Sequence, residues 1–396
     1  MTRFSFNLQT GETGPLTRAP RPDVVNLPLT GQRPVLSVGD QVLAGTKVAE
    51  AVNDTDGDLH APLAGFIREV EPFTMRIEVS GDDKVNADAP CTENGDALKQ
   101  WLREKGVDSR SLYRAQTLII NAVPPEPGIS IFEPLLRDYR KTLEIGLDMV
   151  KRVVEPSKMF LVAAKGNKAN AFANCTVMHV KPVYPNGLDP LVIKTVTGRE
   201  TITGSRPADI TILSVKELYF IGRVAETGRP LTETVMTIGD LNQLVPVGTP
   251  VGFLTNKSGA TVQPGDRVVI GGPLRGMAAV NLEQGVDKDA SGLHILRSGD
   301  SLAATDNFCL GCGECERHCP ARIMPGMISR CAEFKQFKRA ENFHIHSCME
   351  CGLCAYWCKA QRPLLQYIRL AKYELALLAE TNKAAPAATE AIDGES

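Results

Sequence analysis

Eight of the eleven cysteines of the chain stand in two runs near its C-terminal end. Each run has the spacing C-x2-C-x2-C-x3-C. Thiolates at this spacing hold [4Fe–4S] clusters, with the first three on one cluster and the fourth on the other cluster of a pair. The runs therefore predict two clusters and single-electron transfer. The predicted ligands of cluster 1 are Cys309, Cys312, Cys315 and Cys358, and those of cluster 2 are Cys348, Cys351, Cys354 and Cys319.

Zinc and disulfides are the alternatives at these cysteines. Four-cysteine zinc sites use two C-x2-C pairs separated by a loop, whereas here three cysteines follow one another with a fourth close behind. Disulfides are disfavoured because cysteines two residues apart are strained partners, and because residues 1–10 lack the apolar core of a secretory signal. Pro320 completes the iron–sulfur pattern after the first run, and Lys359 takes its place after the second. Iron–sulfur clusters remain the preferred interpretation.

The composition is that of a soluble chain with several cores. Its 396 residues predict roughly two to four domains at about 150 residues each. A formal net charge of −2 argues against nucleic acid as a partner. No apolar stretch approaches the roughly 18–20 residues that cross a bilayer, so the chain is expected to have no transmembrane segment of its own. Because cluster assembly needs reduced thiols, the expected compartment is the cytoplasm.

The first segment predicted to fold is a small β module at about 27–79. Apolar residues alternate there and are punctuated by Gly39-Asp40 and Gly45-Thr46, a pattern typical of short antiparallel hairpins. The segment resembles the barrel-sandwich fold of lipoyl and biotinyl carriers. Such carriers bear a lysine on the hairpin between their halves, whereas 51–58 contains none here. The module is therefore expected to be structural.

The middle of the chain predicts an α/β domain. Short apolar runs at 117–123, 159–164, 176–182, 209–213 and 233–238 are expected to be strands. Apolar residues recur at helical spacing in 131–154, and further helices are expected at 95–106 and 217–227. Strands that alternate with helices indicate a sheet with parallel members.

The remainder predicts a second small β-rich module and a helical cluster domain. Turn residues are dense between 239 and 279. The 28 residues between Cys319 and Cys348 exceed the loop of a minimal two-cluster ferredoxin, and 325–340 has helical character. An amphipathic helix is expected at 363–379, packed on the cluster domain rather than on a membrane, since its polar face carries both charge signs. Residues 382–396 are expected to be disordered.

This order of modules resembles the C subunit of the Rnf electron-transport complex. The likeness covers most of the chain and is strongest in the cluster region. The matching stretches are 309–320, 347–358, 363–369, Leu118–Asn121, Tyr184–Gly187, Val196–Glu200 and Gly271–Gly276. A more distant likeness, to the A subunit of the sodium-pumping NADH:quinone reductase, lies at Ile221–Arg229.

The resemblance implies a multidomain α+β fold. The expected domains are a barrel-sandwich domain at 1–85, a Rossmann-like α/β domain at 86–230, a β-grasp-like (soluble ligand-binding) module at 231–300, a helical domain with two [4Fe–4S] clusters at 301–380, and a disordered tail at 381–396. It also implies a peripheral protein on the cytoplasmic face of the inner membrane. Its implied partners are integral membrane and redox subunits of an Rnf-like complex, and ferredoxin or another small electron carrier.

A flavin site is the feature in which the chain departs from this family. The family, and the related flavin subunit of respiratory complex I, cradle FMN phosphate in a glycine-rich loop before the first strand and admit NADH beside it. The corresponding stretch here, 104–114, has the single glycine Gly106. Beyond the strand, Asn121, Glu126 and Gly128 keep the family pattern and are the candidate FMN remnant. The missing loop argues against binding of FMN and NADH.

Electron relay without catalytic residues is therefore the favoured function. The alternatives are an NADH-oxidising, FMN-containing subunit of the same complex type and an iron–sulfur scaffold for partner proteins.

Other candidates have two interpretations each. His344 and His346 would either donate hydrogen bonds toward cluster sulfurs or lie at the surface. Three basic residues form either a dock for an acidic redox partner or a solvated helix face: Lys335, Lys338 and Arg339. The remaining cysteines, Cys91, Cys175 and Cys331, are expected to be small buried side chains.

Overall fold

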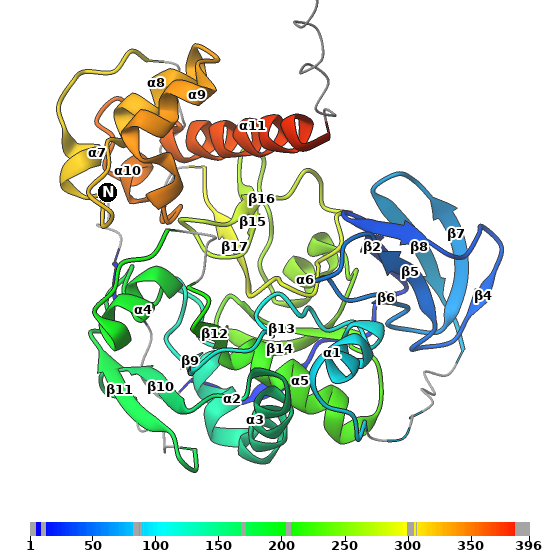
Figure 1. The fold of residues 1–396 in the computed structure, drawn as a ribbon. Helices are drawn as coiled ribbons and strands as arrows, with labels where there is room; N and C mark the ends of the chain where they lie inside the picture. The colour runs from blue at the N-terminus through cyan, green and yellow to red at the C-terminus, as the bar shows by residue number, and fades with distance from the viewer. Residues whose placement is uncertain are drawn as a thin grey trace, which may run out of the picture. The chain divides into compact units, whose positions relative to one another are not determined.

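A computed structural model describes residues 5–8, 13–81, 87, 89, 91–167, 172–202, 207–298, 305 and 307–384. The chain divides into two compact units, Met1–Thr201 with Arg206–Ser301 and Ile202–Ser205 with Leu302–Ser396. Figure 1 shows that the first unit combines several sheets with helices, and that the elements of the second are helices. The fold is therefore mixed α and β with several sheets, as the sequence predicts.

Two small sheets form between Val24 and Val79. Their strands are β2 (Val24–Pro28), β3 (Gln32–Pro34), β4 (Gln41–Val42), β5 (Lys47–Ala51), β6 (Leu59–His60), β7 (Gly65–Val70) and β8 (Thr74–Val79). The strand orders are β2-β8-β7-β4 and β3-β5-β6, and all neighbours are antiparallel. Alternate side chains such as Met75 and Ile77 are fully buried, which explains the alternating pattern in the sequence. The predicted antiparallel hairpins are confirmed.

A four-stranded parallel sheet follows, in the order β11-β10-β9-β12. Its elements are α1 (Gly95–Glu104), β9 (Thr117–Asn121), α2 (Phe132–Asp138), α3 (Arg140–Val154), β10 (Lys158–Ala164), β11 (Thr176–Val180), α4 (Asp189–Thr197), β12 (Ile210–Ser214) and α5 (Val215–Thr227). The parallel arrangement predicted from the alternation of strands and helices is confirmed for the first four expected strands, whereas the fifth, at 233–238, belongs to a different sheet.

The single helix expected at 131–154 is two helices. Tyr139 leaves the helical conformation between them, with φ −117° and ψ 28°. Its ring packs edge-on against Tyr219 of α5, with 5.1 Å between ring centroids. Helical periodicity continues across the break, so the sequence pattern does not reveal it, because tertiary packing overrides local propensity.

A six-stranded sheet completes the first unit. Its elements are β1 (Leu16–Arg18), β13 (Glu233–Ile238), β14 (Leu241–Pro246), α6 (Val251–Lys257), β15 (Arg267–Ile270), β16 (Met277–Ala278) and β17 (Gly292–Leu296), with strand order β1-β14-β13-β17-β15-β16. Strand β1 pairs in parallel with β14. Residues 16–18 therefore join this sheet, although the sequence places them with the β module at 1–85.

The second unit is a set of short helices around one long helix. It contains α7 (Glu314–Arg317), α8 (Pro325–Glu333), α9 (Phe337–Ala340), the 3-10 turns η1 (Glu341–Phe343) and η2 (Ile345–Ser347), α10 (Leu353–Tyr356) and α11 (Leu364–Ala384). The helix expected at 325–340 is divided at Lys335, which takes φ 54°.

Helix α11 corrects the prediction of a disordered tail at 381–396. Residues 381–384 are its last turn, and 385–396 lie outside the described residues. Its apolar face, including Leu364, Ile368, Ala371 and Leu375, is buried in the core of the second unit. The predicted packing of this face is confirmed. None of the helices in the described residues has both the length and the apolarity needed to cross a membrane.

Candidate metal centres

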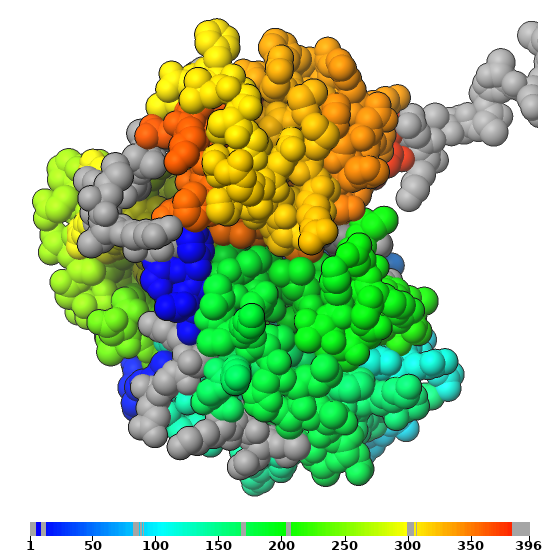
Figure 2. Space-filling view, turned by 90° about the vertical axis from the view of Figure 1, so that its left-hand side faces the viewer, coloured from blue at the N-terminus to red at the C-terminus, as the bar shows by residue number. Residues whose placement is uncertain are grey.

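The first cysteine run starts in an exposed loop, passes through a short helix at Cys315 and ends just beyond it at Cys319. Cys309 and Cys312 are exposed, whereas Cys315 and Cys319 are partly buried. Figure 2 shows the segment that carries this run, in yellow, at the surface of its unit. Gly313 takes φ 72° directly before α7. A left-handed residue at this position favours glycine and turns the chain so that the third cysteine follows on the helix.

The second run has the same local design in more buried surroundings. Cys348, Cys351 and Cys354 are buried, and Cys358 is partly buried. Gly352, at φ 73°, precedes α10 as Gly313 precedes α7. The two runs are therefore two copies of one turn-and-helix unit.

The two runs form an internal repeat whose copies also share backbone conformation and hydrogen bonds. Equivalent residues with positive φ are Gly311 and Glu350, Gly313 and Gly352, and Arg322 and Gln361. The N–H of Gly311 donates to Sγ of Cys309 at 3.5 Å, and the N–H of Glu350 donates to Sγ of Cys348 at 3.4 Å. Backbone N–H groups directed at sulfur stabilise thiolates, and such hydrogen bonds tune iron–sulfur clusters. Each run is thus built to hold thiolate ligands.

Cys319 of the first run lies beside the second run. It lines one hollow together with Cys348, Cys351 and Cys354. The other lining residues are Pro320, Ala321, Pro325, Met349, Glu350, Gly352 and Leu365. The four cysteines of this hollow are those predicted for cluster 2, including the crossing of the fourth cysteine from the other run.

The thiols of this hollow interact electrostatically. Burial raises the pKa of the Cys354 thiol well above its ordinary value, and the nearby Cys348, Cys351 and Cys319 raise it further. Four thiolates this close repel one another, so their joint deprotonated form needs a compensating positive group. The donor set therefore fits a bound iron–sulfur cluster.

The remaining four predicted ligands are less enclosed. Cys315 and Cys358 pack against the same apolar core. Cys315 also lies within electrostatic reach of Cys309. In the described part of the chain, no three Cys, His, Asp or Glu side chains converge on a point that would hold a single metal ion. The thiolates of a [4Fe–4S] cluster each bind a different iron, so its ligands need not converge in this way.

Arg362 connects the start of the first run to the end of the second. Its side chain is 3% exposed and donates to the Glu333 carboxylate at 2.6 Å. It also donates to the Asn307 carbonyl at 2.9 Å, and its backbone N–H donates to Sγ of Cys358 at 3.4 Å. The Thr305 hydroxyl donates to a carbonyl of the same segment at 2.9 Å. These bonds hold the segment before Cys309 beside Cys358.

Glu350 is the charged centre of the second run. Its carboxylate accepts from Lys372 at 2.8 Å and from Arg369 at 3.0 Å. Burial by itself would raise the pKa of Glu350, but the hydrogen bonds and charges of Lys372 and Arg369 outweigh it and lower that pKa. Lys372 also donates to the Cys348 carbonyl at 2.8 Å. Helix α11 is thereby fastened to the first ligand position of the second run.

The structure places around the cysteines several residues that belong to no sequence motif. His318 stacks on Trp357 with 4.2 Å between ring centroids; the sequence assigns no chemistry to either residue, or to Arg362 and Glu350. Aligning the two runs would have paired His318 with Trp357, because each directly precedes a fourth cysteine. The contacts themselves depend on the fold and have no local sequence signal.

The other sequence candidates have ordinary surroundings. His346 lies 3.3 Å from Glu341 and is exposed, and His344 occupies a left-handed turn position at φ 58°. Cys331 and Cys175 are buried, as expected, and Cys91 is half-buried. Of the three basic residues, Arg339 donates to Gln336 at 3.1 Å; a redox dock there stays a prediction.

The flavin remnant residues make contacts within the protein. Asn121 donates to the Gly187 carbonyl at 2.9 Å and to Asp189 at 3.1 Å. Glu126 is buried and accepts from the backbone N–H groups of Leu274 and Arg275 at 2.8 and 2.9 Å. A Cβ added to Gly128, which takes φ +82°, would lie 2.8 Å from the His294 ring. These three residues therefore join segments of the first unit.

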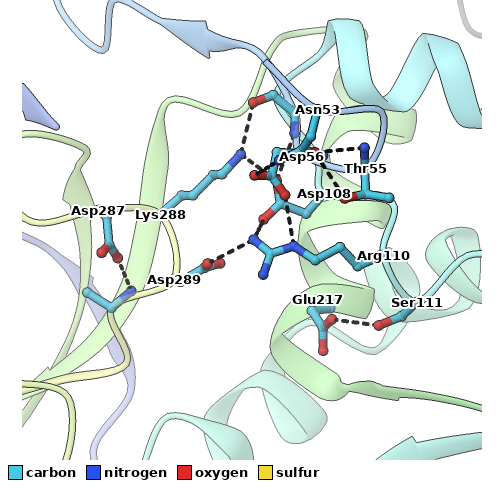
Figure 3. A network of polar contacts seen from close by, with 12 residues as sticks. Asn53, Thr55, Asp56, Asp108, Arg110, Ser111, Glu217, Asp287, Lys288 and Asp289 are labelled. Atoms are coloured by element: carbon cyan, nitrogen blue, oxygen red, sulfur yellow. Dashed lines mark hydrogen bonds and ion pairs between the residues drawn. The ribbon is translucent and has the colours of Figure 1, made fainter. Parts of the chain in front are cut away.

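Ion pairs occupy the stretch that replaces the glycine-rich loop (Figure 3). Arg110 pairs with Asp56 at 2.9 Å and with Asp108 at 3.1 Å, and Asp108 pairs with Lys288 at 2.6 Å. A Cβ added to Gly57 would lie 2.3 Å from the carbonyl carbon of Gly106. The stretch at 104–114 is thus packed against the hairpin at 51–58, where carrier domains bear their lysine.

No protein-family model matches the chain. Three curated relatives are similar to it over most of its length. The C subunit of the proton-translocating ferredoxin:NAD(+) oxidoreductase complex of Clostridium ljungdahlii is 28% identical over 93% of this chain and 92% of the relative. The C subunit of the ion-translocating oxidoreductase complex is 28% identical in Vibrio cholerae, over 78% of this chain and 46% of the relative, and 25% identical in Rhodobacter capsulatus, over 90% and 79%. The chain thus spans about half the length of the Vibrio relative.

These homologues confirm the resemblance noted in the sequence. Among solved structures, a chain of an NAD+-reducing [NiFe]-hydrogenase has a TM-score of 0.43 at 12% identity, covering 80% of this chain and 74% of that one. A likeness at this level supports no functional conclusion.

Proposed function

We propose that this chain, whose homologues are the C subunits of ion-translocating oxidoreductase complexes, is an electron-transfer protein that relays single electrons through two [4Fe–4S] clusters. The observation that supports this most directly is the crossed ligand set. Cys319 leaves the first run and lines one hollow with Cys348, Cys351 and Cys354. Crossing of the fourth cysteine is the mark of a two-cluster arrangement.

The chain's own residues prepare the sites for these clusters. Cys348, Cys351, Cys354 and Cys319 are the proposed ligands of cluster 2, and Cys309, Cys312, Cys315 and Cys358 those of cluster 1. Backbone N–H groups point at three of these sulfurs and lower the energy of the thiolate form. An iron–sulfur cluster, once bound, accepts and releases one electron at a time.

The relay is proposed to work without a flavin in this chain. Glu126 and Gly128 are committed to contacts with other segments, and Asp108 and Arg110 form ion pairs where the family has its phosphate loop. A phosphate cradle needs several free backbone N–H groups and no side chains in front of them. The electrons are therefore proposed to come from another protein of the complex or from a carrier.

The partners are proposed by homology. The homologues are subunits of ion-translocating complexes, and the one from Clostridium belongs to a ferredoxin:NAD(+) oxidoreductase. We assign this chain a peripheral place on the cytoplasmic face of the inner membrane, beside integral membrane and redox subunits, with ferredoxin or another small carrier as exchange partner. Within the chain, the proposed modules are barrel-sandwich, Rossmann-like, β-grasp-like and two-cluster ferredoxin-like.

The test is the metal and flavin content of protein purified without oxygen. Two [4Fe–4S] clusters give about eight irons and eight sulfides per chain, and dithionite reduction should produce the EPR signal of reduced clusters. Cys354→Ser should remove iron, whereas the matched control Cys331→Ser, at a buried cysteine outside the runs, should keep it. Zinc in place of iron would refute the proposal. Stoichiometric FMN bleached by NADH would favour the NADH-oxidising alternative.

A further inference from the structure

We propose that His318 and Trp357 form a positioning pair that sets the spacing of the two iron–sulfur clusters and thereby the coupling between them. The proposal rests on the proposed function. It concerns the place in the second unit where the two copies of the internal repeat meet. Neither side chain is a proposed ligand.

The geometry of the pair is that of a face-to-face stack. The ring centroids are 4.2 Å apart and the ring planes differ by 9°. Tyr356 packs edge-on against Trp357, with 5.3 Å between centroids and 86° between planes. On the other side, Glu314 lies 3.4 Å from Nε2 of His318. Both rings are therefore held from outside the stack as well as by each other.

The two residues occupy equivalent positions in the repeat. His318 directly precedes Cys319 and Trp357 directly precedes Cys358, the fourth cysteines of the two runs. Each follows its own short helix, α7 or α10, with matching backbone bonds from His318 N–H to the Glu314 carbonyl and from Trp357 N–H to the Leu353 carbonyl. The stacked pair is therefore a contact between equivalent positions of the two copies.

This contact adjoins the fourth cysteines of both runs. Cys319 crosses from the first run to the hollow of the second, and the repeat assigns Cys358 the reverse crossing. The chain segments that make these crossings must pass each other, and the stacked rings stand one residue before each crossing cysteine. The thickness of the stack then fixes how far apart the segments run. Smaller side chains would let both segments shift, and the fourth ligand of each cluster would shift with them.

The experiment compares variants of the full chain by iron content and by EPR of the fully reduced protein. Spin coupling between two reduced clusters depends on their separation, so it reports spacing independently of electron-transfer activity. We expect coupling in the wild type, a coupling of clearly different strength in His318→Ala and Trp357→Ala, in which the stack no longer sets the distance, and the wild-type coupling in His318→Phe and Trp357→Phe, which keep an aromatic ring. Phe334→Ala is the matched control, because Phe334 is 65% exposed in the same unit and outside the stack.

Each outcome bears on the proposal. Alanine variants with full iron and unchanged coupling would overturn it. If the alanine variants lose iron, the phenylalanine variants decide: full iron with coupling supports the positioning role, and loss of either iron or coupling overturns it. A wild-type protein without two reducible clusters contradicts the proposed function itself and is recognised before any variant is made.

Discussion

Removing the Arg362 side chain should loosen the start of the first cysteine run while leaving the second run in place. Arg362 is almost fully buried and donates to Glu333 and to the Asn307 carbonyl. Arg362→Met keeps a long apolar stem but loses both donated bonds. The segment before Cys309 then loses one attachment to the residues that follow Cys358 and keeps the hydrogen bonds of Thr305 to Ala360 and Gln361. We therefore expect cluster 1, and not cluster 2, to become labile.

The size of the effect follows from the bond to the Asn307 carbonyl, because the bond to Glu333 runs to α8 and not to the segment before Cys309. A hydrogen bond that involves a charged group contributes about 1.5–3 kcal/mol. Because the hydrogen bonds of Thr305 remain, a value near the lower end, about 1.5 kcal/mol, is expected. At about 1.4 kcal/mol per factor of ten, the open form of this segment rises about 10-fold relative to the closed form.

Iron release to a chelator measures this opening. The wild type should release its irons slowly, and Arg362→Met should release half of them about 10-fold faster, with the other half unchanged. Arg362→Lys keeps a charge but cannot span both acceptors, so an intermediate rate is expected. Arg339→Met is the matched control, because Arg339 is exposed and hydrogen-bonds only locally to Gln336 among the bonds described.

Two results would refute this reasoning. Equal acceleration of all irons would mean that Arg362 stabilises the whole unit rather than one ligand segment. Unchanged release at full iron content would mean that the bonds of Arg362 do not hold Cys309 in place.

Three further changes test other parts of the chain. Burial lowers the pKa of Lys216 from 10.5 to about 8. Below pH 8 the buried amine is charged, and the free-energy cost of burying that charge is fully present. Above pH 8 the folded protein releases the proton, and this cost decreases. The free energy of unfolding of the wild type should therefore gain about 3 kcal/mol relative to Lys216→Met between pH 8 and 10.5, measured by urea titration. Gly222→Ala places a Cβ 2.0 Å from the Thr142 carbonyl oxygen and should destabilise the α3–α5 contact by at least about 1–3 kcal/mol in the same assay. Cys331→Ala should lower the melting temperature slightly and keep every iron.

Sequence reasoning succeeds here where the signal is local. The cysteine spacing acts over ten residues or so, and the alternation of Met75 and Ile77 in a half-buried strand needs only the pleat of that strand. It fails where contacts join distant segments. The break at Tyr139 depends on Tyr219, and the placement of β1 depends on β14, so neither leaves a mark in its own stretch of sequence.

The candidate site divides in the same way. The spacing predicts which cysteines belong together, including the crossing of Cys319, because the curvature of a short helix and its turn is local. The argument against a flavin site is also local, because the sequence shows only one glycine at 104–114, where the family has a glycine-rich loop. What fills its place, the ion pairs of Arg110 with Asp56 and of Asp108 with Lys288, consists of long-range contacts and required the fold.

The internal repeat shows where the two halves have become different. Gly311 takes a positive φ of 66° at no steric cost, whereas its equivalent Glu350 takes φ 53° at a cost of about 1–2 kcal/mol. The partly buried ion pairs of Glu350 with Arg369 and Lys372 offset that cost. Arg362 likewise stands where the first copy has an apolar isoleucine, and its bonds reach back to the first run. The two positions at which the copies differ, Glu350 and Arg362, are thus the positions whose side chains attach each run to the surrounding structure. Comparing the two copies residue by residue locates these positions in the sequence, and only the fold shows what they contact.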